Sequence, residues 1–167
     1  MLCKKKASVH SKGVRWVRSE GLHLTLKFLG DVEDSKVQGI ADALNKAVQG
    51  IAPFQLALHG CGAFPNLRHP RIYWVGIDQP PAALVDLHSR VENCLEELGY
   101  AREGRAFTPH LTVGRVKSGE GIEAVSAQWS QETLQTRAFL IDRVNMMKSD
   151  LKPSGAEYTT LHEIKLV

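Results

Sequence analysis

Hydrophobic and polar residues alternate in several short segments of the chain, a pattern that predicts β-strands with one buried face. The strongest alternation covers residues 22–29, and the positions predicted to enter the core there are Leu22, Leu24, Leu26 and Phe28. Further strands are predicted at 14–17, 53–58, 72–77, from just after Pro109 to 115, at 139–146 and at 158–166. The glycine- and proline-containing stretch 59–70 is predicted to be a loop.

Apolar residues at helical spacing predict two amphipathic helices. The first is capped by Asp34 or Ser35 and runs to about Val48, and the second begins at Pro80-Pro81 and stops at Gly99. Residues 119–134 are predicted to be a loop with a short helix. Strands and helices alternate, so the fold class is α/β or α+β, and the absence of a linker predicts one domain over residues 14–167.

Composition places the chain among ordinary globular proteins, since 43% of its 167 residues are hydrophobic and 23% are charged. No apolar run approaches the ~18 residues that span a bilayer, so we expect no membrane association. The three cysteines, an odd number without C-x-x-C spacing, argue against a disulfide framework and favour the cytoplasm.

The net charge of +3 is concentrated at the start of the chain. Residues 1–18 hold 6 of the 21 basic residues and no acidic one, which leaves 15 basic and 18 acidic residues in the remainder. We therefore expect residues 1–13 to form a flexible basic tail. The body needs no broad basic face of the kind that coats duplex DNA, so a small local site for nucleic acid is favoured.

One tetrapeptide pattern occurs twice on predicted strands, as His23-Leu-Thr-Leu26 and His110-Leu-Thr-Val113. In each copy the histidine and the threonine are two residues apart, so both project from the same face of a strand. Two such strands facing each other would present two imidazoles and two hydroxyls to one cleft. A single H-x-T is usually structural, but a matching pair indicates a shared task.

This set of side chains suits phosphoryl transfer. One imidazole can accept a proton from the attacking water or hydroxyl while the other protonates the leaving oxygen. The hydroxyls of Thr25 and Thr112 can donate to phosphate oxygens, and Arg115 supplies a fixed positive charge suited to phosphate.

Other candidates have simpler interpretations. The remaining histidines of the body, His59, His69, His88 and His162, have no partners at metal-ligand spacing, so we expect no metal site and no cofactor. Gly60-Cys-Gly62 lacks the helix that would follow a phosphate loop and is interpreted as a turn. The basic loop 68–71 is a solvated loop or a contact for an RNA backbone, and Phe64 and Phe107 stack on a base or pack in the core.

The sequence resembles the two-histidine phosphoesterase superfamily, and within it the bacterial RNA 2′,3′-cyclic phosphodiesterases, also called 2′-5′ RNA ligases. The resemblance extends from about residue 14 to the end and lies in 15–17, 22–30, 62–65, 70–76, 107–115 and Tyr158. Paired H-x-T-x motifs with an arginine five residues after the second histidine are highly specific. Members usually open with an apolar strand and a helix, so this chain resembles a form with a shortened start.

The resemblance implies an α+β fold that is bilobal and pseudo-symmetric, with two mainly antiparallel sheets around a central cleft and helices outside. It implies metal-independent hydrolysis of a terminal 2′,3′-cyclic phosphate on RNA to a 2′-phosphate by a monomeric enzyme. On this resemblance His23 and His110 are the catalytic residues, with His23 favoured as the acid, although the pseudo-symmetry allows the reverse. Thr25, Thr112 and Arg115 bind the phosphate.

Two other functions stay open at this point. A chain of the same fold that binds a nucleotide or a phosphate without turnover is the main alternative, but such a protein would be free to lose one of the four motif residues. A metal-dependent hydrolase would need a ligand cluster that the sequence does not supply.

Overall fold

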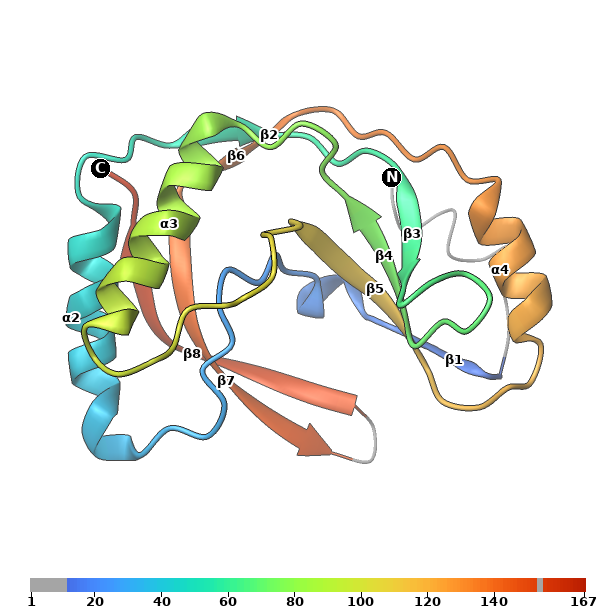
Figure 1. Cartoon of the computed structure of the whole chain (residues 1–167), viewed down its shortest axis with the longest axis horizontal. Helices are drawn as coiled ribbons and strands as arrows, with labels where there is room; N and C mark the ends of the chain where they lie inside the picture. Colours follow the sequence, from blue (N-terminus) through green and yellow to red (C-terminus); the bar gives the residue numbers. More distant parts are fainter. Residues whose placement is uncertain (1–11, 153–154) are drawn as a thin grey trace. The chain divides into compact units, whose positions relative to one another are not determined.

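The computed structural model describes residues 12–152 and 155–167 and has the α+β architecture (Figure 1). The chain divides into two compact units, each built from three separate segments. Unit 1 contains residues up to Thr25, Ala57–Asp78 and Thr108–Arg137, and unit 2 contains Leu26–Leu56, Gln79–Phe107 and Ala138–Val167. In the ranges described, no helix combines the length and apolar character needed to cross a membrane.

Over its described residues, from Lys12 onward, unit 1 contains a four-stranded antiparallel sheet and one α-helix, and the strands follow the order β1-β5-β4-β3. The elements are β1 (Val14–Trp16), a 3-10 turn (Ser19–Gly21), β3 (Cys61–Phe64), β4 (Ile72–Gly76), β5 (His110–Val116) and α4 (Ile122–Ser130). Strand β5 starts directly after Pro109, as predicted, because a proline at that position costs no ladder hydrogen bond.

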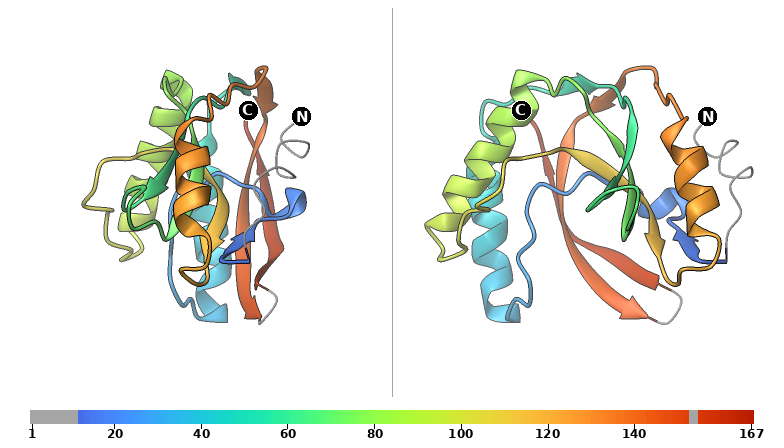
Figure 2. Two further views of the ribbon diagram at one scale, coloured as in Figure 1. Left: turned by 90° about the vertical axis from the view of Figure 1, so that its right-hand side faces the viewer. Right: turned by 45° about the vertical axis from the view of Figure 1, so that its right-hand side comes forward.

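Aromatic packing between the sheet and α4 stabilises unit 1. Tyr73 of β4 is fully buried, and its hydroxyl shares a 2.8 Å hydrogen bond with Ser126 of α4. Burial raises the pKa of this phenol, although the hydrogen bond opposes the shift. The indole Nε1 of Trp129 donates to the carbonyl of Gly62 at 2.9 Å, which ties the end of α4 to β3. One face of the sheet is therefore committed to packing, and Figure 2 shows α4 beside these strands.

Unit 2 contains two long helices and two separate two-stranded ladders. The elements are a 3-10 turn (Asp34–Lys36), α2 (Val37–Val48), β2 (Phe54–Leu56), α3 (Ala82–Glu96), β6 (Phe139–Ile141), β7 (Arg143–Lys152) and β8 (Gly155–Lys165). Strand β2 pairs with β6, and β7 pairs with β8 in a long twisted hairpin that is clear in Figure 2.

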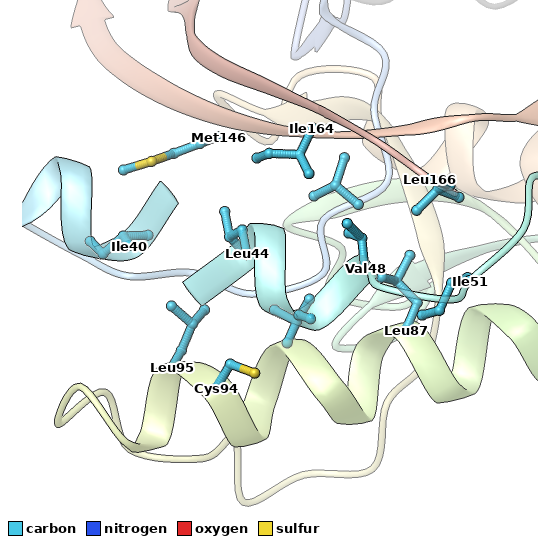
Figure 3. Close-up of a cluster of buried hydrophobic side chains, with 13 residues drawn as sticks. Ile40, Leu44, Val48, Ile51, Leu87, Cys94, Leu95, Met146, Ile164 and Leu166 are labelled. Carbon is cyan, nitrogen blue, oxygen red and sulfur yellow. The ribbon is translucent and has the colours of Figure 1, made fainter. Parts of the chain in front are cut away.

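The helical stripes predicted from the sequence form the core of unit 2. Figure 3 shows Leu44 of α2, Leu87 and Leu95 of α3, and Ile164 of β8 in one cluster of buried side chains. The second helix begins at Ala82, with Pro81 as its N-cap rather than in its first turn as predicted, and Gly99 takes a positive φ of 88° just beyond its end. Neither Asp34 nor Ser35 caps α2 with its side chain, so that detail of the prediction was wrong.

The predicted strand over 22–29 is present only as a single antiparallel bridge at Leu24. Leu26 and Leu29, which a regular strand would point to opposite faces, both pack against the core of unit 2. Phe28 was expected in the core, but its side chain is 81% exposed. The chain leaves the extended conformation after Thr25 because it passes there from one unit to the other.

Three other expectations differ from the structure. The predicted loop 59–70 contains β3, and the Gly60-Cys-Gly62 turn is mostly part of that strand. The body was predicted to hold two sheets, whereas the described residues form one four-stranded sheet and two ladders. Most of the predicted basic tail at 1–13 lies outside the described residues, but Gly13 is buried and its carbonyl accepts the N–H of Lys117 at 2.7 Å.

Candidate active site

The two H-x-T segments lie side by side in unit 1. Leu24 of the first segment and Leu111 of the second form an antiparallel bridge, so the first segment continues the β1 side of the sheet beside β5. The two tetrapeptides, distant in the sequence, therefore lie next to each other in the sheet. The two copies are neighbours in a ladder rather than strands on separate sheets.

This bridge places all four polar motif residues on one face. With Leu24 opposite Leu111, the register puts His23 opposite Thr112 and Thr25 opposite His110. Side chains alternate along strands, so these four point away from the face that Leu24 and Leu111 occupy. The two histidines are diagonal neighbours across the two strands. Strand geometry puts the Cα atoms of such neighbours roughly 7–8 Å apart. At neighbouring positions of this kind, both imidazoles can reach one phosphate group bound on this face.

Arg115 reaches the same face because β5 contains a bulge. In a regular strand, residues five apart point to opposite faces, so Arg115 and His110 would be separated by the sheet. The ladder with β4 pairs Trp74 with Thr112 and Tyr73 with Gly114, which leaves Val113 as the extra residue. Beyond this bulge Arg115 lies opposite Ile72, two residues along β4 from Trp74 and on the same face. The exposed guanidinium thus joins the motif residues.

Both imidazoles are oriented by the same backbone contact. The Nδ1 of His23 lies 2.8 Å from the carbonyl oxygen of Gly21, and the Nδ1 of His110 lies 2.7 Å from that of Thr108. A carbonyl oxygen only accepts, so each Nδ1 carries a proton and donates it. The nitrogen that exchanges protons in each ring is then Nε2. The two rings make equivalent backbone contacts, which suits a pair in which either one can serve as acid or base.

Aromatic side chains lie beside His110 on the same face. The ring centroid of Phe64 is 5.0 Å from that of His110 and 5.4 Å from that of Trp74. The indole of Trp74 lies across Gly62, its partner in the β3–β4 ladder. Trp74 Nε1 is buried and has no hydrogen-bond partner among the residues that the structure describes. Sequence reasoning identified Phe64 but missed Trp74, because the position of the indole depends on a glycine in a strand that was predicted to be a loop.

We expect Gly62→Ala to lower the melting temperature by several degrees. A Cβ at this position would lie 2.1 Å from a ring carbon of Trp74, so the indole would have to move. Overpacking of this kind costs about 1–3 kcal/mol. Thermal unfolding measures the effect, and Gly119→Ala is the matched control because a Cβ there meets nothing within 4 Å. Equal melting temperatures for the two variants would contradict the described position of Trp74.

The other predicted candidates lie elsewhere or serve the fold. Phe107 belongs to unit 2, where its ring stacks on His88 with a centroid distance of 3.8 Å. His59 is exposed, with its Nδ1 3.8 Å from a carboxylate oxygen of Asp78. Residues 12–152 and 155–167 bring no three histidine, cysteine, aspartate or glutamate side chains into an arrangement that could hold a metal ion.

Solved structures share the fold of this chain. TT0787 from Thermus thermophilus superposes with a TM-score of 0.82 at 24% identity, covering 99% of this chain and 89% of that chain. LigT from E. coli, crystallised with 3′-AMP, gives a TM-score of 0.77 at 23% identity over 99% of this chain and 88% of that chain. These matches show that the chain has the fold that the sequence resemblance implied.

The family follows from the sequence. The profile of the 2′-5′ RNA ligase superfamily matches residues 4–153. An RNA 2′,3′-cyclic phosphodiesterase of Methanothermobacter thermautotrophicus is 32% identical over 154 residues, covering 92% of this chain and 83% of that protein. The enzyme of the same name from Archaeoglobus fulgidus is 35% identical over 153 residues, covering 89% of this chain and 82% of that protein. The chain belongs to the 2′-5′ RNA ligase superfamily, which confirms the family predicted from the two motifs.

Proposed function

We propose that this protein is an RNA 2′,3′-cyclic phosphodiesterase that opens a terminal 2′,3′-cyclic phosphate to a 2′-phosphate. The observation that carries the proposal is the pair of imidazoles on one face of one sheet, each with Nδ1 committed to a backbone carbonyl. The relatives that bear this activity in their names match the chain over most of its length.

The hydrolysis requires one proton to be removed and one to be supplied. The Nε2 of one histidine takes a proton from water as the water oxygen bonds to phosphorus. The bond from phosphorus to the ribose 3′ oxygen breaks, and the Nε2–H of the other histidine protonates that oxygen to give the 3′-hydroxyl. The phosphate stays on the 2′ oxygen. We assign the acid to His23 and the base to His110, following the resemblance.

The remaining residues of the face bind and orient the substrate. Thr25 and Thr112 donate hydroxyl protons to the non-bridging oxygens, and Arg115 provides the positive charge. Phe64 is the ring that we propose for stacking on the terminal base, because it lies beside His110. Phe107 is less suited to that role since one face of its ring is stacked on His88.

The proposed substrate is an RNA 3′ end or a nucleotide that carries a 2′,3′-cyclic phosphate. The name of the relatives specifies RNA, and E. coli LigT has been crystallised with 3′-AMP. Action as a monomer, in the cytoplasm and without a resident cofactor or metal stays a prediction from the sequence.

Incubation with nucleoside 2′,3′-cyclic phosphates tests the function. We expect a 2′-phosphate product, identified by phosphorus NMR against authentic 2′- and 3′-nucleotides, at a rate that EDTA does not change. Formation of the 3′-phosphate would overturn the assigned bond cleavage, and activity that EDTA abolishes and a divalent ion restores would overturn the metal-free mechanism. Binding of the cyclic nucleotide without turnover would favour the non-catalytic binding module instead.

A further inference from the structure

A buried ion pair in unit 2 joins Lys27, which closely follows the first motif, to Glu92 of α3. The ammonium of Lys27 donates to both carboxylate oxygens of Glu92, at 3.0 and 2.9 Å. The side chains are only 7% and 3% exposed, so both charges are removed from water. Glu92 lies in the middle of α3, on the face that otherwise carries its apolar residues. A lysine and a glutamate at such positions are seldom fully buried unless they are paired.

The same two groups bind a third segment of the chain. Lys27 also donates to the carbonyl of Ala101 at 2.7 Å, and the backbone N–H of Glu103 donates to Glu92 at 3.0 Å. Burial alone would raise the pKa of Glu92, but the hydrogen bonds from Lys27 and the Glu103 N–H hold it below its usual value. Glu92 is therefore ionised at neutral pH and connects α3, residue 27 and residues 101–103.

A second contact on α3 holds the end of that third segment. His88, one helical turn before Glu92, stacks on Phe107 with the two rings 9° from parallel. Its Nε2 lies 3.9 Å from a Glu92 oxygen. Burial lowers the pKa of His88, which keeps the ring neutral for this stacking at pH 7. The face of α3 around Glu92 thus fixes residues 101–107 at both ends.

Both fixed segments continue directly into the motifs. Lys27 is two residues after Thr25, where the first motif ends. Phe107 is followed by Thr108, whose carbonyl accepts the Nδ1 proton of His110. Only two or three residues of backbone separate each of these segments from a proposed motif residue. A shift of either segment is therefore expected to move that residue as well.

We propose that Glu92 is a positioning residue for the proposed hydrolysis, because its carboxylate holds together, within unit 2, the chain segment that follows the first H-x-T motif and the segment that leads to the second. The expected effect on the rate rests on the proposed function. The expected effect on the positions of the two segments rests only on the contacts described above. A misplacement of about 1 Å at a reacting group can cost about 10²-fold in rate. We therefore expect the effect of Glu92 to fall on kcat.

A purely structural role must be distinguished from positioning. Removal of one partner of a buried ion pair destabilises a protein strongly, whereas replacement of both by apolar residues is often neutral or stabilising. The single variants Glu92→Gln and Lys27→Met will therefore lower both the melting temperature and kcat. The double variant Lys27→Met/Glu92→Leu removes both charges and is expected to recover the melting temperature.

The decisive measurement is kcat of that double variant, taken well below its melting temperature on a nucleoside 2′,3′-cyclic phosphate. We expect kcat to stay about 10- to 100-fold below that of the native protein, with a much smaller change in KM, because the backbone of residues 101–103 has lost its partners. The control is Lys46→Met, which removes the exposed ion pair between Lys46 and Glu97 and touches neither motif segment. Its kcat should equal that of the native protein.

Two kinetic outcomes would overturn the positioning role: native kcat in the double variant, or single variants that lose stability but keep kcat while folded. Imidazole NMR signals provide a readout that needs no activity. The ring signals of His23 and His110 should shift in Glu92→Gln and in the double variant and stay in place in Lys46→Met. Unshifted signals would contradict the proposal even if the double variant were slow. A native protein that hydrolyses no cyclic phosphate would defeat the proposed function alone and leave the NMR comparison valid.

Discussion

Replacement of His23 or His110 by alanine is expected to lower kcat for a nucleoside 2′,3′-cyclic phosphate by about 10²–10⁴-fold in each case. Each imidazole exchanges a proton at Nε2, as acceptor in the base and as donor in the acid, since each Nδ1 donates to a carbonyl two residues earlier. The loss of either ring leaves the reaction without its base or without its acid. Steady-state kinetics at saturating substrate measure the effect.

The double variant should be little slower than either single variant, because the two rings act as one unit and the first removal already disables it. His59→Ala is the matched control, as His59 lies in the same unit and its exposed side chain has its Nδ1 3.8 Å from Asp78. Losses that multiply in the double variant would show that the histidines act independently. An unchanged kcat in either single variant would exclude that histidine from the chemistry.

The dependence of kcat on pH should follow a bell with both histidines present, because one ring must be neutral and the other protonated. A cyclic ester with sulfur in place of the 3′ oxygen separates the two roles, since a thiolate leaves without protonation. We expect this substrate to restore much of the rate to His23→Ala and little to His110→Ala. The opposite pattern would reverse the assignment of acid and base.

The sequence predicts the helices and the strand of the second motif well, because one physical rule decides each. The spacing of Leu87, Val91 and Leu95 requires a helix with one buried side, and these residues are in the core of unit 2. Pro109 fixes where β5 can begin, so His110 opens the strand. For both elements the structure that the local sequence pattern favours is also the one that the tertiary contacts stabilise. The sequence pattern alone is then sufficient to predict the element.

Other features depend on partners that the local pattern does not contain. The alternation of residues 22–29 predicts a full strand, but Leu26 and Leu29 are drawn into the core of unit 2, and only Leu24 keeps a strand partner. Glu92 looks like an ordinary surface residue in the sequence. The one signal available in the sequence is its place on the buried side of α3, between Val91 and Leu95 and four residues after His88.

The side of the sheet to which Arg115 points is the feature that most clearly cannot be predicted from the sequence alone. Five residues separate it from His110, and strict alternation along β5 would place its side chain on the packed face of the sheet. The extra residue Val113 in the ladder with β4 changes the alternation by one position. A bulge of this kind is visible only once the partners Tyr73 and Trp74 are known.

Arg115→Ala is accordingly expected to lower kcat/KM for a nucleoside 2′,3′-cyclic phosphate by about 10²–10³-fold, the usual loss when a preorganised group that stabilises transition-state charge is removed. Arg115→Lys keeps the charge but loses the planar fork that binds two phosphate oxygens at once, so it should recover only part of the rate. Arg68→Ala, in an exposed loop of the same unit, is the control and should act as the native protein on this small substrate. If Arg115 pointed to the packed face, its removal would reduce the melting temperature and leave kcat/KM of the folded protein intact. A large loss of kcat/KM at an unchanged melting temperature would instead establish that the bulge at Val113 delivers the guanidinium to the phosphate.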